Sequence, residues 1–373
     1  MTDFLGLTWD HPRGRNALEA AAPRIGGQDR LHWHVQPLEG FESAPIEELA
    51  RGYDLLVLDH PHLGDALATD SLRPLDELFD AEQLRAWEQA AIGPALDSYR
   101  MAGRLWALPL DAATQVSARR PDLVPEAPTM WTEVEQLAER GLLALSLAGP
   151  HAFLSLCSVA VSFGDDPGST PGQLFQRSTA QRALALLVRL ASRAPTGSEL
   201  LNPIGLLDRM RDRGDIGYIP LVYGYVNYAA PDLAFGPVPT DEGRVGSTLG
   251  GTGIAVTRRT DPTPALLEHL RWLLQEHTQR TFIPAHDGQP GLRAAWTDPE
   301  VDAAAHGFYS ATRHVLESAW VRPRLPGYIP FQSAASAIVR AVVAGERPAA
   351  GALDEIEERF ATLAAHLRRE DLL

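Results

Sequence analysis

The chain has 373 residues, of which 45% are hydrophobic and 22% are charged, a composition typical of globular proteins, and the length suits two domains. All 33 basic residues are arginine, and with 48 acidic residues the formal net charge is −15. This charge argues against a nucleic-acid partner, and the lack of lysine excludes Schiff-base catalysis and a Walker-type phosphate lysine.

The only cysteine, Cys157, excludes an internal disulfide and any multi-cysteine metal site, and its apolar neighbours predict that it belongs to the core. No stretch approaches the ~20 apolar residues of a membrane span. The first ten residues resemble a core strand and lack the features of a secretory signal. We therefore expect a cytoplasmic protein as the sequence stands, or a periplasmic or extracellular one if a signal has been trimmed.

The first part of the chain alternates between strand and helix patterns. The expected elements, in chain order, are a strand at Phe4–Thr8, a helix at Asn16–Ala22, a strand at Leu31–Pro37, a helical turn at Ile46–Arg51 and a strand within Tyr53–Asp59. Nearly continuous apolar runs are typical of buried parallel strands, so a β-α-β lobe with helices on both faces is expected. Binding loops then lie at the strand ends.

After Leu110 the chain is expected to cross to a second lobe. Thr129 and Thr132 are candidate caps for the first helix of this lobe. The expected elements are a helix at Trp131–Arg140, a buried strand at Leu142–Leu147, and helices at His151–Phe163 and Thr179–Ser192. A strand at Gly250–Val256 is then expected to return across the hinge to the first lobe, followed by a helix at Pro264–Gln279 and a helical tail from Ala303 onward that packs on the second lobe.

Several short motifs occur in succession along the chain. An apolar strand opens into an aromatic and glycine loop at 215–225, a Pro-bracketed strand follows at 234–239, and a Gly-Gly-Thr-Gly strand at 249–256 precedes an amphipathic helix. Further motifs occupy 99–110, 128–137, 296–299 and 322–328. Together this set resembles the extracellular solute-binding proteins of sugar-type ABC importers (maltose-binding-protein-like, family 1), and the resemblance covers nearly the whole chain.

The resemblance implies an α/β, two-lobe, periplasmic-binding-protein-like fold (type II), with a ligand cleft between lobes joined by hinge strands. The lobes are expected at 1–110 plus 258–302 and at 111–257 plus 303–373. It also implies capture of a small polar ligand by hinge closure for ABC-type import, permease subunits as partners, a monomer and no cofactor. A sugar, a sugar acid or a related carboxylate would suit this role.

Two polar clusters follow predicted strands. The first holds Trp9, Asp10, His11, Arg13 and Arg15, and the second holds Asp59, His60 and His62. If the two strands are parallel neighbours, their carboxyl ends bring both clusters to one edge. Arginine pairs with carboxylates, and aspartate accepts hydroxyl hydrogen bonds, so the clusters are predicted to bind ligand. The alternative is that the two aspartates cap helices and the histidines lie on the surface.

These histidines and aspartates are also acceptable zinc or iron ligands. However, no helical His-x3-His or Glu-x-x-His pattern accompanies them. We therefore assign no metal site.

The aromatic loop supplies Tyr223, Tyr225 and Tyr228 where the resemblance places a ring that stacks on sugar. The alternative is that these tyrosines belong to the core. Gly250 and Gly251 are expected to permit close backbone approach. The remaining cleft candidates, each of which would serve equally well in packing, are Trp106, Asp111, Trp296, Tyr309, Arg322 and Tyr328.

Two other functions stay open at this stage. One is a cytoplasmic enzyme on the same fold, with His11, His60 or His62 as general acid or base and Asp10, Asp59 or Asp111 as the orienting or second catalytic group. The other is a cytoplasmic ligand sensor that acts on a partner protein.

Overall fold

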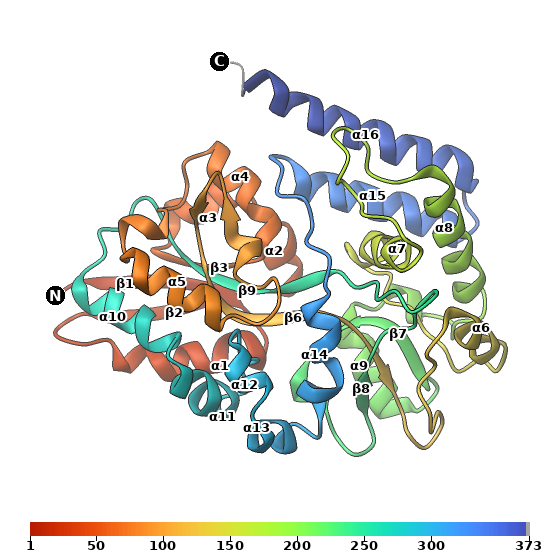
Figure 1. The fold of residues 1–373 in the computed structure, drawn as a ribbon, viewed down its shortest axis with the longest axis horizontal. Helices are drawn as coiled ribbons and strands as arrows, with labels where there is room; N and C mark the ends of the chain where they lie inside the picture. Colours follow the sequence, from red (N-terminus) through yellow and green to blue (C-terminus); the bar gives the residue numbers. More distant parts are fainter. Residues whose placement is uncertain (371–373) are drawn as a thin grey trace. The chain divides into compact units, whose positions relative to one another are not determined.

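The computed structural model describes residues 1–370 (Figure 1). The chain divides into two compact units, which we describe separately. Unit 1 comprises residues 1–113, 225–227 and 250–310, and unit 2 comprises 114–224, 228–249 and the chain from 311 onward.

Unit 1 is built on a sheet with the strand order β2-β1-β3-β9. These strands span Asp3–Trp9 (β1), Arg30–Gln36 (β2), Leu55–Leu58 (β3) and Leu249–Val256 (β9). β1 pairs in parallel with both β2 and β3, and β9 runs antiparallel to β3. The predicted parallel pairing of the first strands is therefore confirmed. All four residues of β3 are buried, so both faces of the sheet are covered.

The helices of unit 1 follow the predicted alternation with the strands. They span Pro12–Ala21 (α1), Leu38–Ser43 (α2), Ile46–Gly52 (α3), Leu63–Ala68 (α4), Ala81–Ala90 (α5), Pro264–Leu273 (α10), Ile283–Ala285 (α11), Arg293–Trp296 (α12) and Pro299–Ala304 (α13). A two-stranded ribbon joins Arg100–Met101 (β4) to Arg104–Leu105 (β5).

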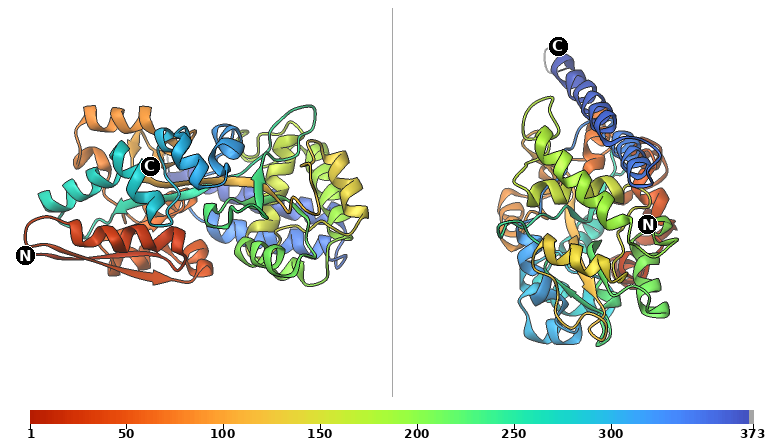
Figure 2. Two further views of the ribbon diagram at one scale, coloured as in Figure 1. Left: turned by 90° about the horizontal axis from the view of Figure 1, so that it is seen from below. Right: turned by 90° about the vertical axis from the view of Figure 1, so that its right-hand side faces the viewer.

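Unit 2 contains most of β6, together with β7 and β8, which both pair with β6 in antiparallel fashion. The strands span Leu108–Arg119, Tyr218–Tyr223 and Ala234–Gly236. The helices span Trp131–Glu139 (α6), His151–Ser162 (α7), Arg177–Ala191 (α8), Pro203–Arg213 (α9), Phe308–Glu317 (α14), Tyr328–Val343 (α15) and Ala349–Glu370 (α16). The start of α14, up to Ser310, belongs to unit 1. α15 and α16 lie side by side (Figures 1 and 2).

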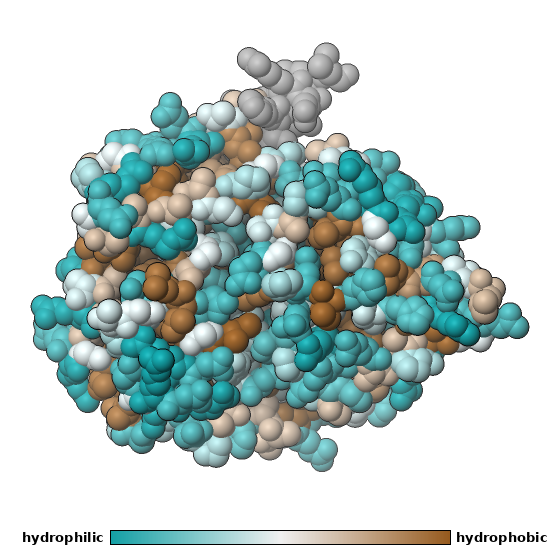
Figure 3. Space-filling view, turned by 180° about the vertical axis from the view of Figure 1, so that it is seen from behind, coloured by the Kyte–Doolittle hydropathy of each residue, from teal (hydrophilic) through white to brown (hydrophobic). Residues whose placement is uncertain are grey.

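The core of unit 2 includes nearly all of α7, as its apolar sequence predicts. Cys157 is fully buried there, which confirms the prediction, and burial raises the pKa of its thiol. On the face shown in Figure 3, hydrophobic residues form small patches between hydrophilic ones. Within residues 1–370, no helix is long and apolar enough to cross a membrane.

Four expectations need correction. Leu142–Leu147 is not a strand, since only Leu143 forms an isolated bridge. The helix from Pro264 ends at Leu273, and a short π-helical turn follows at Thr278–Phe282.

The other two corrections concern a helix cap and a lobe boundary. Met130, not a threonine, precedes α6, and the Glu133 carboxylate accepts from the backbone N–H groups of Thr129 and Met130 at 2.7 and 3.1 Å. Residues 250–256 belong to unit 1, because β9 pairs with β3, so this strand returns to the first lobe as expected and only the boundary given at 257 differs.

Candidate functional site

The carboxyl end of β1 leads directly into α1. His11 is the N-cap of this helix, and its Nδ1 accepts a hydrogen bond of 3.1 Å from the backbone N–H of Arg13. Pro12 occupies the first turn, where its missing N–H carries no cost. The N-cap of α1 is therefore His11 and not Asp10. It fixes where the helix begins, and so the directions in which the side chains of the first turn point.

Arg13 forms a buried ion pair with Asp111 of β6. Their side chains are each 4% exposed, Nε of Arg13 donates to Asp111 Oδ2 at 2.7 Å, and Nη2 bonds the other carboxylate oxygen. Burial raises the pKa of Asp111, and the charge of Arg13 opposes that rise. This bidentate pairing engages both carboxylate oxygens with one guanidinium, so it fixes the positions of both groups.

Tyr225 covers this ion pair. The Arg13 guanidinium lies over its ring at 4.6 Å from the centroid, and the His11 ring meets it edge-on at 4.9 Å. Tyr225 is only 5% exposed, and burial raises the pKa of its hydroxyl. The ring is thus anchored by a cation–π contact as part of the cluster.

Tyr309 joins the cluster from the start of α14. Its ring is 1% exposed and packs edge-on against Trp296 at 5.0 Å. Its hydroxyl is buried without a hydrogen-bond partner among the described side chains, those of residues 1–365, and it interacts electrostatically with Asp111 and Arg13. An unsatisfied buried hydroxyl is costly, and it is a donor that an incoming polar group can use.

Two glycines of β9 pass close to Asp111. Gly251 has φ of +89°, and a Cβ placed on it would lie 2.5 Å from the Asp111 carbonyl oxygen. Gly250 is adjacent and half-buried. The expected close backbone approach is therefore present at Gly251.

We predict that Gly251→Ala destabilises the protein by roughly 1–3 kcal/mol, because alanine would take a left-handed conformation and its Cβ would meet backbone. Urea denaturation measures this effect. The matched control is Gly52→Ala, where a Cβ would meet nothing within 4 Å. Equal stability of the two variants would contradict the close approach.

The second predicted cluster forms the turn η2 (His60–His62) after β3. Asp59 is its N-cap and accepts from the backbone N–H of His60 at 2.9 Å, so its capping role is real. His60 and His62 are 0% and 4% exposed, which corrects the alternative that they lie on the surface. After burial, charge repulsion from Asp59 also raises the pKa of Asp111, so the two clusters are near enough to interact electrostatically.

The more accessible polar groups lie on the outer side of α1. Asp10 and Arg15 form an exposed ion pair, and Asn16 donates to Asp287 at 2.7 Å. Burial, followed by the charges of Arg13 and Arg15, lowers the pKa of His11 to about 4. His11 is therefore a neutral acceptor at pH 7.

Gln289, which the sequence interpretation did not single out, ties the Tyr225 loop to β6. Its Oε1 accepts from the Val226 backbone at 3.0 Å, and its Nε2 donates to the Ala112 carbonyl at 2.7 Å. Asn227 also donates to the Asp287 carbonyl. No motif marks these residues, because each contact joins segments distant in sequence.

Most of the other predicted residues have packing roles or belong to unit 2. Trp9 is core and packs on Phe41 at 5.1 Å, and the Trp296 indole N–H donates to the Pro290 carbonyl at 2.8 Å. Tyr223 and Arg322 belong to unit 2, where both donate to the Leu249 carbonyl, at 3.4 and 3.2 Å. The structure thus brings together, within unit 1, Asp10, His11, Arg13, Arg15, Asp59, Asp111, Tyr225, Gly251 and Tyr309.

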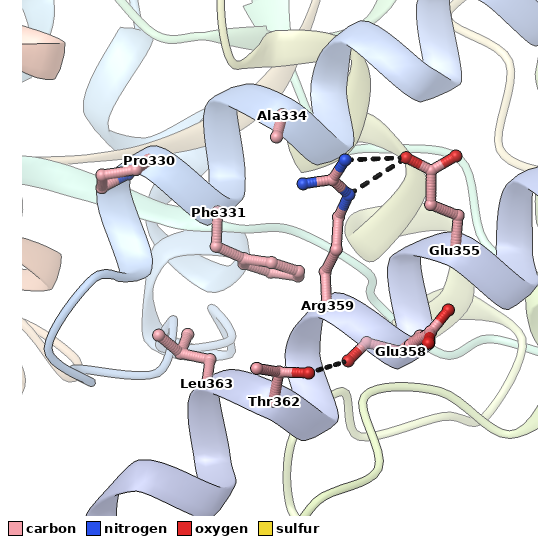
Figure 4. Close-up of a pocket in the computed structure, with 8 residues that line it drawn as sticks. All are labelled: Pro330, Phe331, Ala334, Glu355, Glu358, Arg359, Thr362 and Leu363. Atoms are coloured by element: carbon pink, nitrogen blue, oxygen red, sulfur yellow. Dashed lines mark hydrogen bonds and ion pairs between the residues drawn. The ribbon is translucent and has the colours of Figure 1, made fainter.

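Two other arrangements bear on where a ligand or metal could bind. Among the side chains of residues 1–365, no three of His, Cys, Asp or Glu come together as metal ligands would. A groove of about 520 Å³ between α15 and α16 is lined by Phe331, Leu363 and charged residues (Figure 4). In that groove Arg359 is paired with Glu355 at 2.9 Å, so these two charged groups already satisfy one another.

No protein-family model matches the sequence. The fold, however, is that of known structures. The sugar-binding protein MalE from Xanthomonas citri superposes with a TM-score of 0.79 at 17% identity, covering 98% of each chain. An ABC transporter solute-binding protein from Agrobacterium radiobacter K84, in complex with ribitol, gives 0.80 at 20% identity, covering 97% of this chain and 98% of that one.

A solute-binding protein from Agrobacterium vitis S4 with bound D-mannitol gives a TM-score of 0.75 at 16% identity, covering 100% of this chain and 99% of that one. Each of these similarities extends over nearly the full length of both superposed chains. The predicted two-lobe, periplasmic-binding-protein-like α/β fold is confirmed.

Proposed function

We propose that this chain is a solute-binding protein that captures a small polar ligand, a sugar, sugar acid or polyol, for ABC-type import. The observation that carries the proposal is the full-length fold similarity to proteins described as binding sugars, ribitol and mannitol. Fold alone does not define function, so the site chemistry must agree. The permease subunits of an importer would be its protein partners.

The unit 1 cluster supplies the chemistry for such a ligand. Asp59 and Asp10 offer carboxylate oxygens that accept from vicinal hydroxyls, and the Tyr309 hydroxyl has unused hydrogen-bonding capacity. Arg13 and Asp111 then act by positioning Tyr225, since each is already engaged by the other. Arg15, at the edge, is suited to a ligand carboxylate.

The enzyme alternative has weaker support. His11 uses Nδ1 as a helix cap, and its lowered pKa of about 4 lies far from the neutral value that suits a general base. His60 and His62 are enclosed within the fold. A binding role does not require any of the three histidines to titrate near neutral pH or to reach the ligand as an acid or base.

Ligand identity is tested by thermal unfolding with ribitol, mannitol, maltose and hexuronic acids. A ligand that binds only the native protein stabilises it by about 2.7 kcal/mol at a hundredfold excess over its dissociation constant. Mass spectrometry of the ligand after long incubation should recover it unchanged. A product formed by the wild type and lost in His60→Ala or His62→Ala would favour the enzyme.

We predict that Asp10→Asn combined with Arg15→Gln weakens binding of the identified ligand roughly tenfold, because hydrogen bonds to charged groups contribute about 1.5–3 kcal/mol. The melting temperature should be unchanged, since exposed ion pairs contribute little to stability. The control is Glu88→Gln with Arg100→Gln, another exposed pair in unit 1. Calorimetric titration measures the affinities, and equal affinity in both double variants would place the ligand elsewhere.

A further inference from the structure

Unit 1 contains a pocket that the proposed function does not use. It has a volume of about 330 Å³ and lies between α10 and the turn after α1, and it is lined mainly by Arg24, Gly26, Gly27, Glu268, His269 and Trp272. Its size is at the lower end of the range for small-molecule sites. Its chemistry is independent of the Arg13–Asp111 cluster.

His269 lines this pocket with a buried imidazole ring. The side chain is 3% exposed, and neither Nδ1 nor Nε2 has a hydrogen-bond partner among the side chains described, those of residues 1–365. Buried polar atoms are normally paired, because leaving one unpaired in the folded protein is costly. A ligand group that accepts or donates at His269 would remove this cost.

Arg24 provides a positive charge that is not paired with a carboxylate among the described residues. Its guanidinium lies 4.8 Å from the ring centroid of Trp272 and 5.1 Å from that of Phe282. Within the part of the chain that the structure describes, it forms neither an ion pair nor a hydrogen bond, although the protein has 48 acidic residues. The carboxylate that lines the same pocket, Glu268, is paired with Arg271 at 3.4 Å.

We propose that this pocket binds a small planar carboxylate. A guanidinium stacked on a ring keeps its N–H groups in its own plane, where they can bond both oxygens of a carboxylate. The imidazole of His269 provides a further polar contact, and Trp272 provides an aromatic wall for an attached apolar or ring group. Gly26 and Gly27 have no side chains that would narrow the opening.

The test uses benzoate as probe and benzamide as its neutral isostere, with the full chain labelled with 15N at histidine. Benzoate is expected to shift the ring signals of His269 with a dissociation constant on the order of 1 mM. The signals are identified by their loss in His269→Phe. Benzamide should leave them unchanged, because it lacks the charge that Arg24 recognises.

Arg24→Gln should weaken benzoate binding at least tenfold, because it removes a charge-assisted pair. The matched control is Arg85→Gln, which removes another exposed arginine of unit 1, outside the pocket, and should leave the affinity unchanged. His269→Phe should weaken binding roughly two- to tenfold, as expected for the loss of one neutral hydrogen bond.

Unchanged benzoate affinity in Arg24→Gln, or no shift of His269 at 50-fold the expected dissociation constant, would overturn the proposal. Tighter binding of inorganic phosphate than of benzoate would contradict the preference for a planar anion. Arg24→Gln should bind the sugar or polyol ligand like the wild type, so failure at this pocket is distinguishable from failure of the proposed function.

Discussion

Asp111→Leu is expected to lower the free energy of unfolding by about 3–5 kcal/mol, because it leaves the Arg13 guanidinium buried without its counter-charge. Urea denaturation, followed by both tryptophan fluorescence and circular dichroism, measures the loss. Tyr225 should also become more accessible, since its ring rests on Arg13. Ligand affinity should also fall, because Arg13 would no longer hold the Tyr225 ring in place.

The double variant Arg13→Met, Asp111→Leu is the control for that result. It removes both charges and replaces them with apolar groups, so we expect stability much closer to that of the wild type. If Asp111→Leu alone cost less than about 1 kcal/mol, the pair would behave as a solvated surface pair, and its buried geometry would be wrong.

The stability of the protein should fall steeply as the pH drops from 6.5 to 4. Burial lowers the pKa of both His11 and His269 to about 4, from an ordinary value of 6.5. The unfolded chain therefore binds protons in this interval that the folded protein does not. The stabilising contribution is fully present above 6.5, decreases through the interval and is lost below 4, by about 3 kcal/mol for each histidine.

His269→Phe isolates one of these contributions from the titration of the carboxylates. The difference in stability between wild type and variant should change by about 3 kcal/mol between pH 7 and pH 4. The exposed His277→Gln is the matched control and should show a constant difference. Parallel curves for wild type and His269→Phe would mean that His269 is solvated.

Some elements of the fold follow from the amino-acid sequence alone, and others do not. Apolar runs predicted β1, β3, α7 and α8, because the spacing of the hydrophobic residues in a strand or helix indicates which face is buried. The run at 142–147 failed as a strand because its backbone finds only one bridge partner. Apolar composition shows that a segment is buried and does not show what it pairs with.

For the candidate site, the sequence by itself determined that polar clusters follow β1 and β3, and parallel pairing then brings them to one edge. It did not determine their roles. Arg13 and Arg15 differ by two helical positions, which places them on different faces, so one is buried and the other is partly exposed. Only the tertiary structure decided that Asp111, 98 residues away within a continuously buried strand, is the partner of Arg13. Such a pairing depends on long-range packing, which residue spacing does not record.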